Sequence, residues 1–109
     1  MTDLALERDL VQKCRESAEG MGAMLAEVGQ RRAKGSGTTL GFPDLVLLCA
    51  GHVELIEVKR TKTADTPRGV LNLGQIVFIE RALAQRVVVP VIERVEDFEA
   101  LVNACRRRA

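Results

Sequence analysis

Two short apolar runs lie close together in the chain, Gly41-Phe-Pro-Asp-Leu-Val-Leu-Leu48 and Val53-Glu-Leu-Ile-Glu-Val-Lys-Arg60. Each run keeps charged residues that a buried strand does not usually tolerate: Asp44 in the first run, and Glu57 and Lys59 in the second. Because burying an unpaired charge is costly, such charges remain where they are paired or where they hold a metal ion. The two runs therefore indicate both the centre of the fold and the position of a site.

The two runs are typical of an antiparallel hairpin with a tight turn between them. Successive side chains of a strand point to opposite faces, so the turn decides which residues share a face. A two-residue turn at 51–52 pairs Asp44 with Lys59, whereas a turn at 50–51 pairs Asp44 with Glu57. In both registers these three residues converge on one face at one end of the hairpin. A turn of odd length would place Asp44 on the opposite face.

The opposite face of the hairpin carries a set of apolar residues. They are Leu45, Leu47, Cys49, Ile56 and Val58. Because the first face is also apolar apart from its charged end, we expect both sides of these strands to be covered. This pattern predicts a central sheet sandwiched between helices.

The composition bounds the class of protein. With 109 residues, 47% of them apolar and 28% charged, the chain is expected to form a single globular domain over residues 1–109. No stretch approaches the roughly 20 apolar residues of a membrane span, and the N-terminus does not have the order of a secretory signal. The three cysteines, Cys14, Cys49 and Cys105, fall inside apolar patterns and are predicted to be core residues. We expect a cytoplasmic protein with no membrane partner.

Apolar periodicity predicts the elements around the hairpin. They are a helix over 3–20, a strand over 23–28, the hairpin strands 44–50 and 53–60, a helix over 73–85, a strand over 86–92 and a helix over 95–105. The resulting order is α-β-β-β-α-β-α. It predicts an α/β fold.

Two of these elements carry more specific expectations. Asn72 is a candidate N-cap for the helix over 73–85, whose apolar positions are 76, 79, 82 and 83. The run over 86–92 is rich in β-branched residues, which predicts a buried strand. Pro90 cannot donate to a ladder, so this strand should lie at an edge of the sheet or carry a bulge.

Two polar residues of the helices have more than one interpretation. The apolar stripe of the first helix steps in threes and fours from Leu4 to Met21, and Glu7 fills its one missing step. Its carboxylate is either in line with core positions or a helix N-terminal acid that reaches to water, and periodicity does not decide between them. Gln75 lies in the first turn of its helix, where a solvent-facing amide is expected.

Basic residues gather in the two loops that flank the hairpin. They are Arg31, Arg32 and Lys34 on one side, and Arg60, Lys62 and Arg68 on the other. Clustered charge can attract a phosphate backbone even at a net charge of +1, although solvated loops would look the same. At 3% aromatic residues, platforms for stacking bases are nearly absent. A nucleic-acid partner should therefore be held by its backbone and shape.

The charged cluster of the hairpin matches metal-assisted hydrolysis of a phosphodiester. Mg²⁺ is usually bound by one or two carboxylates and keeps several waters, so Asp44 and Glu57 are candidate ligands, with the Val58 carbonyl as a third. Lys59 could orient the attacking water or offset charge on the phosphate, and Glu7 could complete the metal shell. The alternative is a surface ion pair of Lys59, which contributes almost nothing to stability.

The order Pro43-Asp44, then Glu57-x-Lys59, resembles the signature of PD-(D/E)XK nucleases. With Gly41-Phe-Pro-Asp-Leu, Ile56-Glu-Val-Lys and Leu73-Gly-Gln75, the chain resembles their virus-type replication-repair nuclease branch, the VRR-NUC domain. The resemblance implies a restriction-endonuclease-like core, α-β-β-β-α-β plus a C-terminal helix, with a central mixed sheet flanked by helices. It also implies a catalytic set made of Glu7, Asp44, Glu57, Lys59 and Gln75.

The resemblance further implies an activity. It is that of a small viral or bacterial homodimer that uses Mg²⁺ or Mn²⁺ to cut branched DNA such as Holliday junctions, in replication and repair. Two sites related by a two-fold axis suit the cutting of two opposed strands. The alternative is a DNA-binding or assembly protein on a nuclease-like fold whose site no longer cuts.

Overall fold

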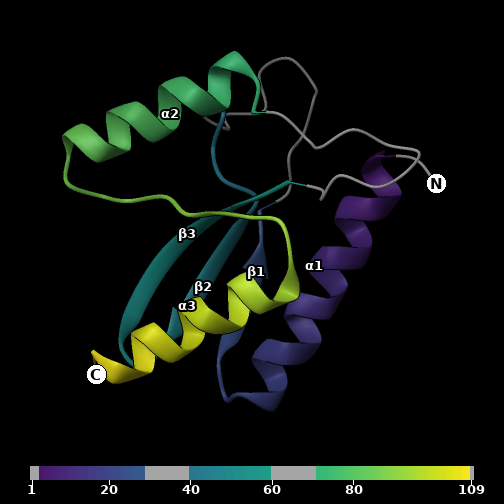
Figure 1. The fold of residues 1–109 in the computed structure, drawn as a ribbon. Helices are drawn as coiled ribbons and strands as arrows, with labels where there is room; N and C mark the ends of the chain where they lie inside the picture. The colour runs from purple at the N-terminus through teal and green to yellow at the C-terminus, as the bar shows by residue number, and fades with distance from the viewer. Residues whose placement is uncertain (1–2, 29–39, 60–70, 109) are drawn as a thin grey trace.

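The computed structural model describes residues 3–28, 40–59 and 71–108. Within these ranges the chain order is the predicted one (Figure 1). The elements are α1 (Asp3–Gly20), β1 (Met24–Glu27), β2 (Leu45–Cys49), β3 (His52–Val58), α2 (Leu73–Ala84), β4 (Val91–Ile92) and α3 (Val95–Arg107). The predicted α/β class is confirmed. Over the described part of the chain, no helix has both the length and the apolar character needed to cross a bilayer.

The strands form one mixed sheet in the order β1-β2-β3-β4. The first three strands are antiparallel neighbours, and β4 pairs with β3 in parallel. The parallel pair requires a crossover, which is supplied by the segment that contains α2. β4 lies at the edge of the sheet and directly follows Pro90, as the missing N–H of that residue predicts.

The turn of the hairpin selects one of the two predicted registers. Cys49 pairs with His52, so the turn consists of Ala50 and Gly51. Both turn residues have a left-handed φ, 51° and 83°, as a two-residue turn with the twist of the flanking strands requires. Continuing the pairing of β2 with β3 by one step places Asp44 opposite Glu57.

One face of the sheet is covered by α1 and α3. In Figure 1 these two helices lie side by side across it, and the Ser17 hydroxyl of α1 bonds the Glu99 carboxylate of α3 at 2.6 Å. The predicted core cysteines are confirmed, since all three are free and buried. The core consists of Leu10, Cys14, Ala18, Leu25, Leu45, Leu47, Cys49, Ile56, Val58, Ile92, Phe98, Val102 and Cys105.

The other face of the sheet is not covered along its whole length, contrary to expectation. We call its apolar part the open face. Its outer row, Met24, Leu48 and Val53, is paired across three strands and is 61%, 39% and 65% exposed. The next row is partly buried and contains Ala26, Val46 and Leu55. Helices flank both sides of the sheet only near its charged end, where α2 reaches it.

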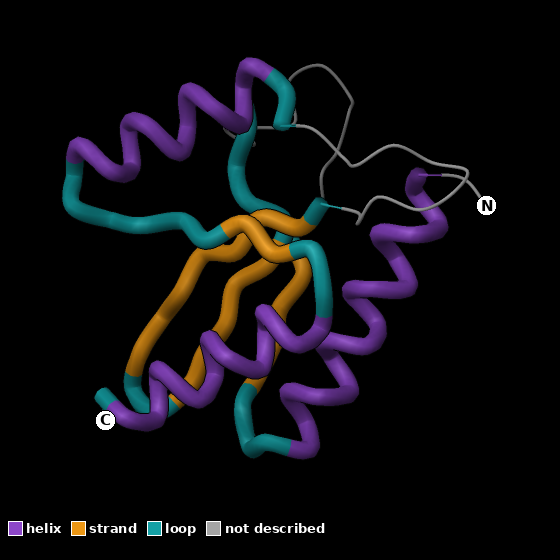
Figure 2. The backbone as a smooth tube through the Cα atoms, in the orientation of Figure 1, coloured by secondary structure: helices purple, strands orange, loops and turns teal. Residues whose placement is uncertain are grey.

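The expected strand over 86–92 is wrong except for its last two residues. Arg86 has a φ of 63°, and the chain then runs outside the sheet, with Val88 68% exposed (Figure 2). Only Val91–Ile92 pairs with β3. Pro90 has no N–H to donate, so the ladder begins with its carbonyl, which accepts from the backbone N–H of Glu57. The β-branched composition therefore did not indicate a strand before Pro90, where Val87 and Val88 are exposed although Val89 is buried.

α2 is held at its N-terminal end. Asn72 caps the helix as predicted, accepting from the backbone N–H of Gln75 at 2.9 Å. The rings of Phe42 and Phe78 meet edge to face, with their centroids 5.4 Å apart. A Cβ added to Gly41 would lie 2.1 Å from the carbonyl oxygen of Gly74, so only glycine permits this close backbone approach. The loop before Asp44 thus fixes the first turn of α2.

This close approach predicts that adding one methyl group at position 41 strongly lowers the free energy of unfolding. Gly41 has a φ of 78°, so Gly41→Ala should cost about 1 kcal/mol for its conformation and about 2 kcal/mol more for the displaced backbone. Gly51→Ala is the matched control, because its φ is 83° but its added Cβ meets no atom within 4 Å. It should cost only about 1 kcal/mol. Urea titrations that give equal losses for the two variants would contradict the close contact.

Candidate active site

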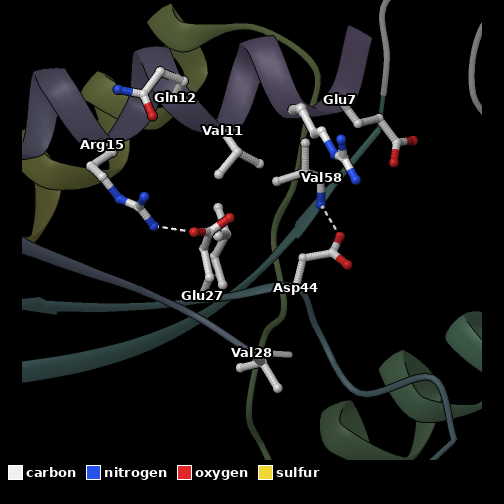
Figure 3. A pocket seen from close by; sticks show the side chains of 10 residues that line it. Glu7, Val11, Gln12, Arg15, Glu27, Val28, Asp44 and Val58 are labelled. Atoms are coloured by element: carbon white, nitrogen blue, oxygen red, sulfur yellow. Dashed lines mark hydrogen bonds and ion pairs between the residues drawn. The ribbon is translucent and has the colours of Figure 1, made fainter. Parts of the chain in front are cut away.

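At the end of the hairpin ladder, the side chain of Asp44 takes the place of a backbone hydrogen-bond acceptor. Its Oδ2 accepts a hydrogen bond from the backbone N–H of Val58 at 3.1 Å (Figure 3). By the observed register, Val58 lies opposite Pro43, which has no N–H to offer. The carboxylate of Asp44 therefore accepts the Val58 N–H in place of the carbonyl of residue 43, which an ordinary antiparallel ladder would use.

The same register directs the Val58 carbonyl toward Asp44. The N–H groups of Glu57 and Lys59 bond the carbonyls of Pro90 and Ile92 at 3.0 and 2.9 Å, so these two residues point their backbone toward β4. The residue between them points both its N–H and its C=O the other way, toward β2. Proline at position 43 removes the donor that this carbonyl would have had. The geometry supports Val58 as the predicted oxygen ligand.

Glu57 is buried and held by α2. Its side chain is 1% exposed, and its Oε1 accepts a hydrogen bond from Gln75 Nε2 at 3.0 Å. The Oε1 of Gln75 accepts in turn from the backbone N–H of Asn72 at 2.9 Å. The expectation of a solvent-facing amide from helix position alone is wrong, because the contact with Glu57 buries Gln75. One amide thus connects the helix cap to the acid.

The electrostatics of Glu57 show that the predicted site residues meet. The pKa of Glu57 is raised from 4.5 to about 9, mainly by burial and then by the hydrogen bond to Asp44 and the charge of Asp44. The positive charge of Lys59 opposes the shift, and Glu7 adds to it. Two carboxyl groups in contact in a buried place cannot both ionise cheaply. A cation beside the pair would lower the cost of ionising both groups.

A cleft of about 670 Å³ opens beside Asp44. Glu7 of α1, Asp44 and Val58 line it, whereas Glu57 lies next to Asp44 without lining it (Figure 3). Glu7 is partly buried at this cleft, which agrees with its place in line with the apolar stripe rather than on the wet side. The cleft is thus where a substrate could reach the acids.

Sequence reasoning missed three polar residues of α1 that also line the cleft, Arg8, Gln12 and Arg15. Their spacing of four and three residues was a usable signal, because it places them on one side of the helix next to Glu7. Arg15 forms an ion pair with Glu27 of β1 (Figure 3). Two guanidinium groups therefore stand along the same cleft as the acids.

Six of the predicted DNA contacts are not tested by this structure. Arg31, Arg32, Lys34, Arg60, Lys62 and Arg68 lie outside the described residues. The described residues that flank these segments are Val28, Leu40, Lys59 and Leu71. Within the described part, the backbone N–H of Val28 bonds the Asp44 carbonyl at 2.9 Å.

The donor set fits a hard divalent cation such as Mg²⁺ or Mn²⁺. Among the described residues no group of three His, Cys, Asp or Glu side chains could hold a metal ion. Two carboxylates and a backbone carbonyl nevertheless match the usual protein share of a Mg²⁺ site, in which water fills the other positions. A cation beside Asp44 and Glu57 would also remove the repulsion that raises the pKa of Glu57.

A solved structure described as a "VRR_NUC domain" has the same fold. It superposes with a TM-score of 0.61 at 19% sequence identity, over 89% of this chain and 94% of that chain. No family model matches the sequence. No curated protein matches it either. At this identity the likeness shows the fold alone, and it confirms the predicted restriction-endonuclease-like core.

The buried acid predicts how stability depends on pH. In metal-free buffer Glu57 keeps its proton in the folded chain up to about pH 9, whereas the unfolded chain releases it near pH 4.5. The free energy of unfolding should therefore fall as the pH rises between these values. Glu57→Gln should flatten this decline and raise the Tm at pH 8 by several degrees, since about 1 kcal/mol corresponds to roughly 4–8 °C.

Glu19→Gln, on an exposed part of α1, is the control and should keep the decline. Thermal melts between pH 5 and pH 9 provide the measurement. A decline that is as steep in Glu57→Gln as in the unchanged chain would show that Glu57 is not the group responsible.

Proposed function

We propose that the chain is a divalent-metal-dependent endonuclease that hydrolyses phosphodiester bonds in DNA. The observation that carries this proposal is the meeting of Asp44 and Glu57 across the end of the hairpin, with Lys59 and the Val58 carbonyl beside them. The fold shared with a VRR_NUC domain supports the reaction class.

Each residue has a role that follows from its position. Asp44, Glu57 and the Val58 carbonyl hold Mg²⁺ or Mn²⁺, which supplies a Lewis acid and a more acidic bound water when it is present. Lys59 follows Glu57 by two residues, so it shares the face of the acid and can orient the attacking water or offset charge on the phosphate. Glu7 reaches the metal shell from α1, directly or through water.

Gln75 acts as a positioning residue in this scheme. Its Nε2 donates to Glu57, while its Oε1 is held by the cap of α2, so the amide cannot turn freely. It therefore fixes the direction in which the Glu57 carboxylate presents its oxygens. A ligand whose orientation is set in advance costs less to order when the metal binds.

The cleft provides a path for a phosphate backbone. Arg8 and Arg15 line it on the side of α1. The ion pair of Arg15 with Glu27 is exposed, so it contributes little and can give way to a phosphate. We propose that Arg31, Arg32, Lys34, Arg60, Lys62 and Arg68 extend this basic surface, since Val28 bonds the Asp44 carbonyl just before the first segment and Glu57 closely precedes the second.

The proposed substrate is branched DNA, such as a four-way junction, and the proposed active form is a homodimer. A two-fold arrangement supplies two sites for two opposed strands. With aromatic residues at 3% of the chain, recognition must rest on the backbone and the shape of the DNA.

A second candidate is a DNA-binding or assembly protein on the same fold that does not cut. One observation favours it: in the ranges that the structure describes, the acids do not form a group of three metal-binding side chains. Calorimetric titration with Mn²⁺ separates the candidates. A site that binds Mn²⁺ supports the nuclease, whereas DNA affinity without Mn²⁺ binding supports the second candidate.

Substitution of the two acids should remove cleavage but not binding. Asp44→Asn and Glu57→Gln should each lower the cleavage rate of a labelled four-way junction by at least about 100-fold, as expected when a catalytic group is lost. EDTA should have the same effect. Glu54→Gln is the matched control, because Glu54 lies on β3 but faces away from Glu57. Cleavage that survives both substitutions and EDTA would remove the proposal.

The cationic residues of the cleft should affect affinity instead. Arg8→Ala and Arg15→Ala should each weaken DNA binding and reduce the slope of log K against log salt by about 1, as loss of one phosphate contact predicts. Lys13→Ala removes a charge from the same helix outside the cleft lining and serves as the control. Equal slopes for all three variants would place the DNA elsewhere.

A further inference from the structure

The open face is an unusual surface for a single folded chain. Its two rows are entirely apolar, and they run without a break across β1, β2 and β3. Val91 of β4 pairs with Glu57, so it continues the same face at the edge strand and is also exposed. A sheet face of this kind is normally covered by a helix or by a second sheet.

α2 is the counterpart of this surface. Its sequence, LGQIVFIERALA, contains only Glu80 and Arg81 as charged residues, and a helix that is apolar on all sides belongs in an interior. Gln75 is nevertheless the only buried residue of α2. The helix stands apart from α1 and α3 (Figure 1), and the segment that follows it exposes Val87 and Val88.

We propose that α2 and the segment over 85–90 of one copy cover the open face of a second copy, and the reverse, across a two-fold axis. In the part of the chain that the structure describes, one apolar sheet face and one apolar helix are exposed. In a two-fold dimer, α2 of each chain covers the open face of the partner, so both helices and both sheet faces are buried. A contact without symmetry would leave one helix and one sheet face exposed. Glu80 and Arg81 have opposite signs, so α2 adds no net charge to the contact.

The available area is sufficient for such a dimer. A half-exposed Val, Leu, Ile or Met side chain presents roughly 60 Å² of apolar surface, at about 30 Å² for each CH₂ group. Nine such side chains therefore offer on the order of 500 Å². A standard interface uses about 800 Å² per partner, a little more than half of it apolar. The nine are Met24, Leu48, Val53, Ile76, Val77, Leu83, Val87, Val88 and Val91.

This inference rests on the proposed homodimer but not on cleavage. It also connects the interface to the site, because the row of Asp44 and Glu57 directly follows the two apolar rows on the same face. The interface would therefore fix the separation of the two sites. Oligomeric state and catalysis are measured separately, so failure of one proposal is distinguishable from failure of the other.

Sedimentation equilibrium of the full chain tests the surface. We expect the unchanged chain to dimerise within a range of about 1–100 µM, and Val53→Glu and Val77→Glu to raise the dimer Kd at least about 100-fold. Both side chains are exposed, so the monomer fold should persist in circular dichroism. Asn103→Glu, exposed on α3, is the control and should leave the Kd unchanged. Val53→Glu should still bind Mn²⁺.

A monomer at every concentration would overturn the proposal, and so would a Val53→Glu chain that dimerises like the unchanged one. Cross-linking tests the arrangement itself. Chains carrying Val53→Cys are mixed with chains carrying Val77→Cys and treated with a short bis-maleimide; the three native thiols are buried. We expect a mixed cross-link between the two variants. A predominant cross-link between two Val53→Cys chains would overturn the placement of the helix on the sheet.

Discussion

The two-residue turn of the hairpin sets the position of the polar groups that β2 and β3 bring to the candidate site. Ala50 and Gly51 both take a left-handed φ, and this closes the turn with a register that places Asp44 opposite Glu57. One more residue in the turn would send the Asp44 side chain into the core beneath α1 and α3. The carbonyl of Val58, the contact between the carboxyl groups and the alignment of Lys59 all depend on this pairing.

Burial of the Glu57 carboxyl lowers the stability of the folded chain above the ordinary pKa of a glutamate. A buried carboxyl with a pKa raised to about 9 by its surroundings is not what packing alone would select. Both acids nevertheless have hydrogen-bond partners. Gln75 donates to Glu57, and Asp44 accepts from the backbone N–H of Val58. No buried side-chain N or O atom in the described part of the chain lacks a hydrogen-bond partner. A cluster of acids that is costly to bury and is nevertheless fully hydrogen-bonded indicates a function.

Much of the fold could be predicted from the sequence because its signals are local. Alternation within the hairpin gave two registers that both brought Asp44 and Glu57 together, and apolar periodicity predicted the extents of α1 and α3. The rest depended on contacts between distant segments. α2 is apolar on all sides, so its periodicity could not show which side faces the sheet, and the β-branched run before Pro90 has no neighbouring strand to pair with.

Some residues of the candidate site could likewise be predicted from local sequence, whereas others depend on contacts between distant segments. Asp44, Glu57 and Lys59 could be placed by strand geometry alone, whereas the burial of Gln75 comes from its contact with Glu57, which lies on another element. The arginines of the cleft were overlooked because their spacing follows α1 and not the acidic motif.

The amide of Gln75 has a consequence beyond orientation. Gln75 is the N3 residue of the capping box of α2 and also donates a hydrogen bond to the buried acid. When the first turn of α2 frays, the Glu57 carboxylate therefore loses this hydrogen bond as well. Whatever immobilises Glu57 must also suppress opening of the first turn of α2. Amide protons in that turn would then exchange with solvent more slowly, so exchange at the helix end would report how firmly Glu57 is held.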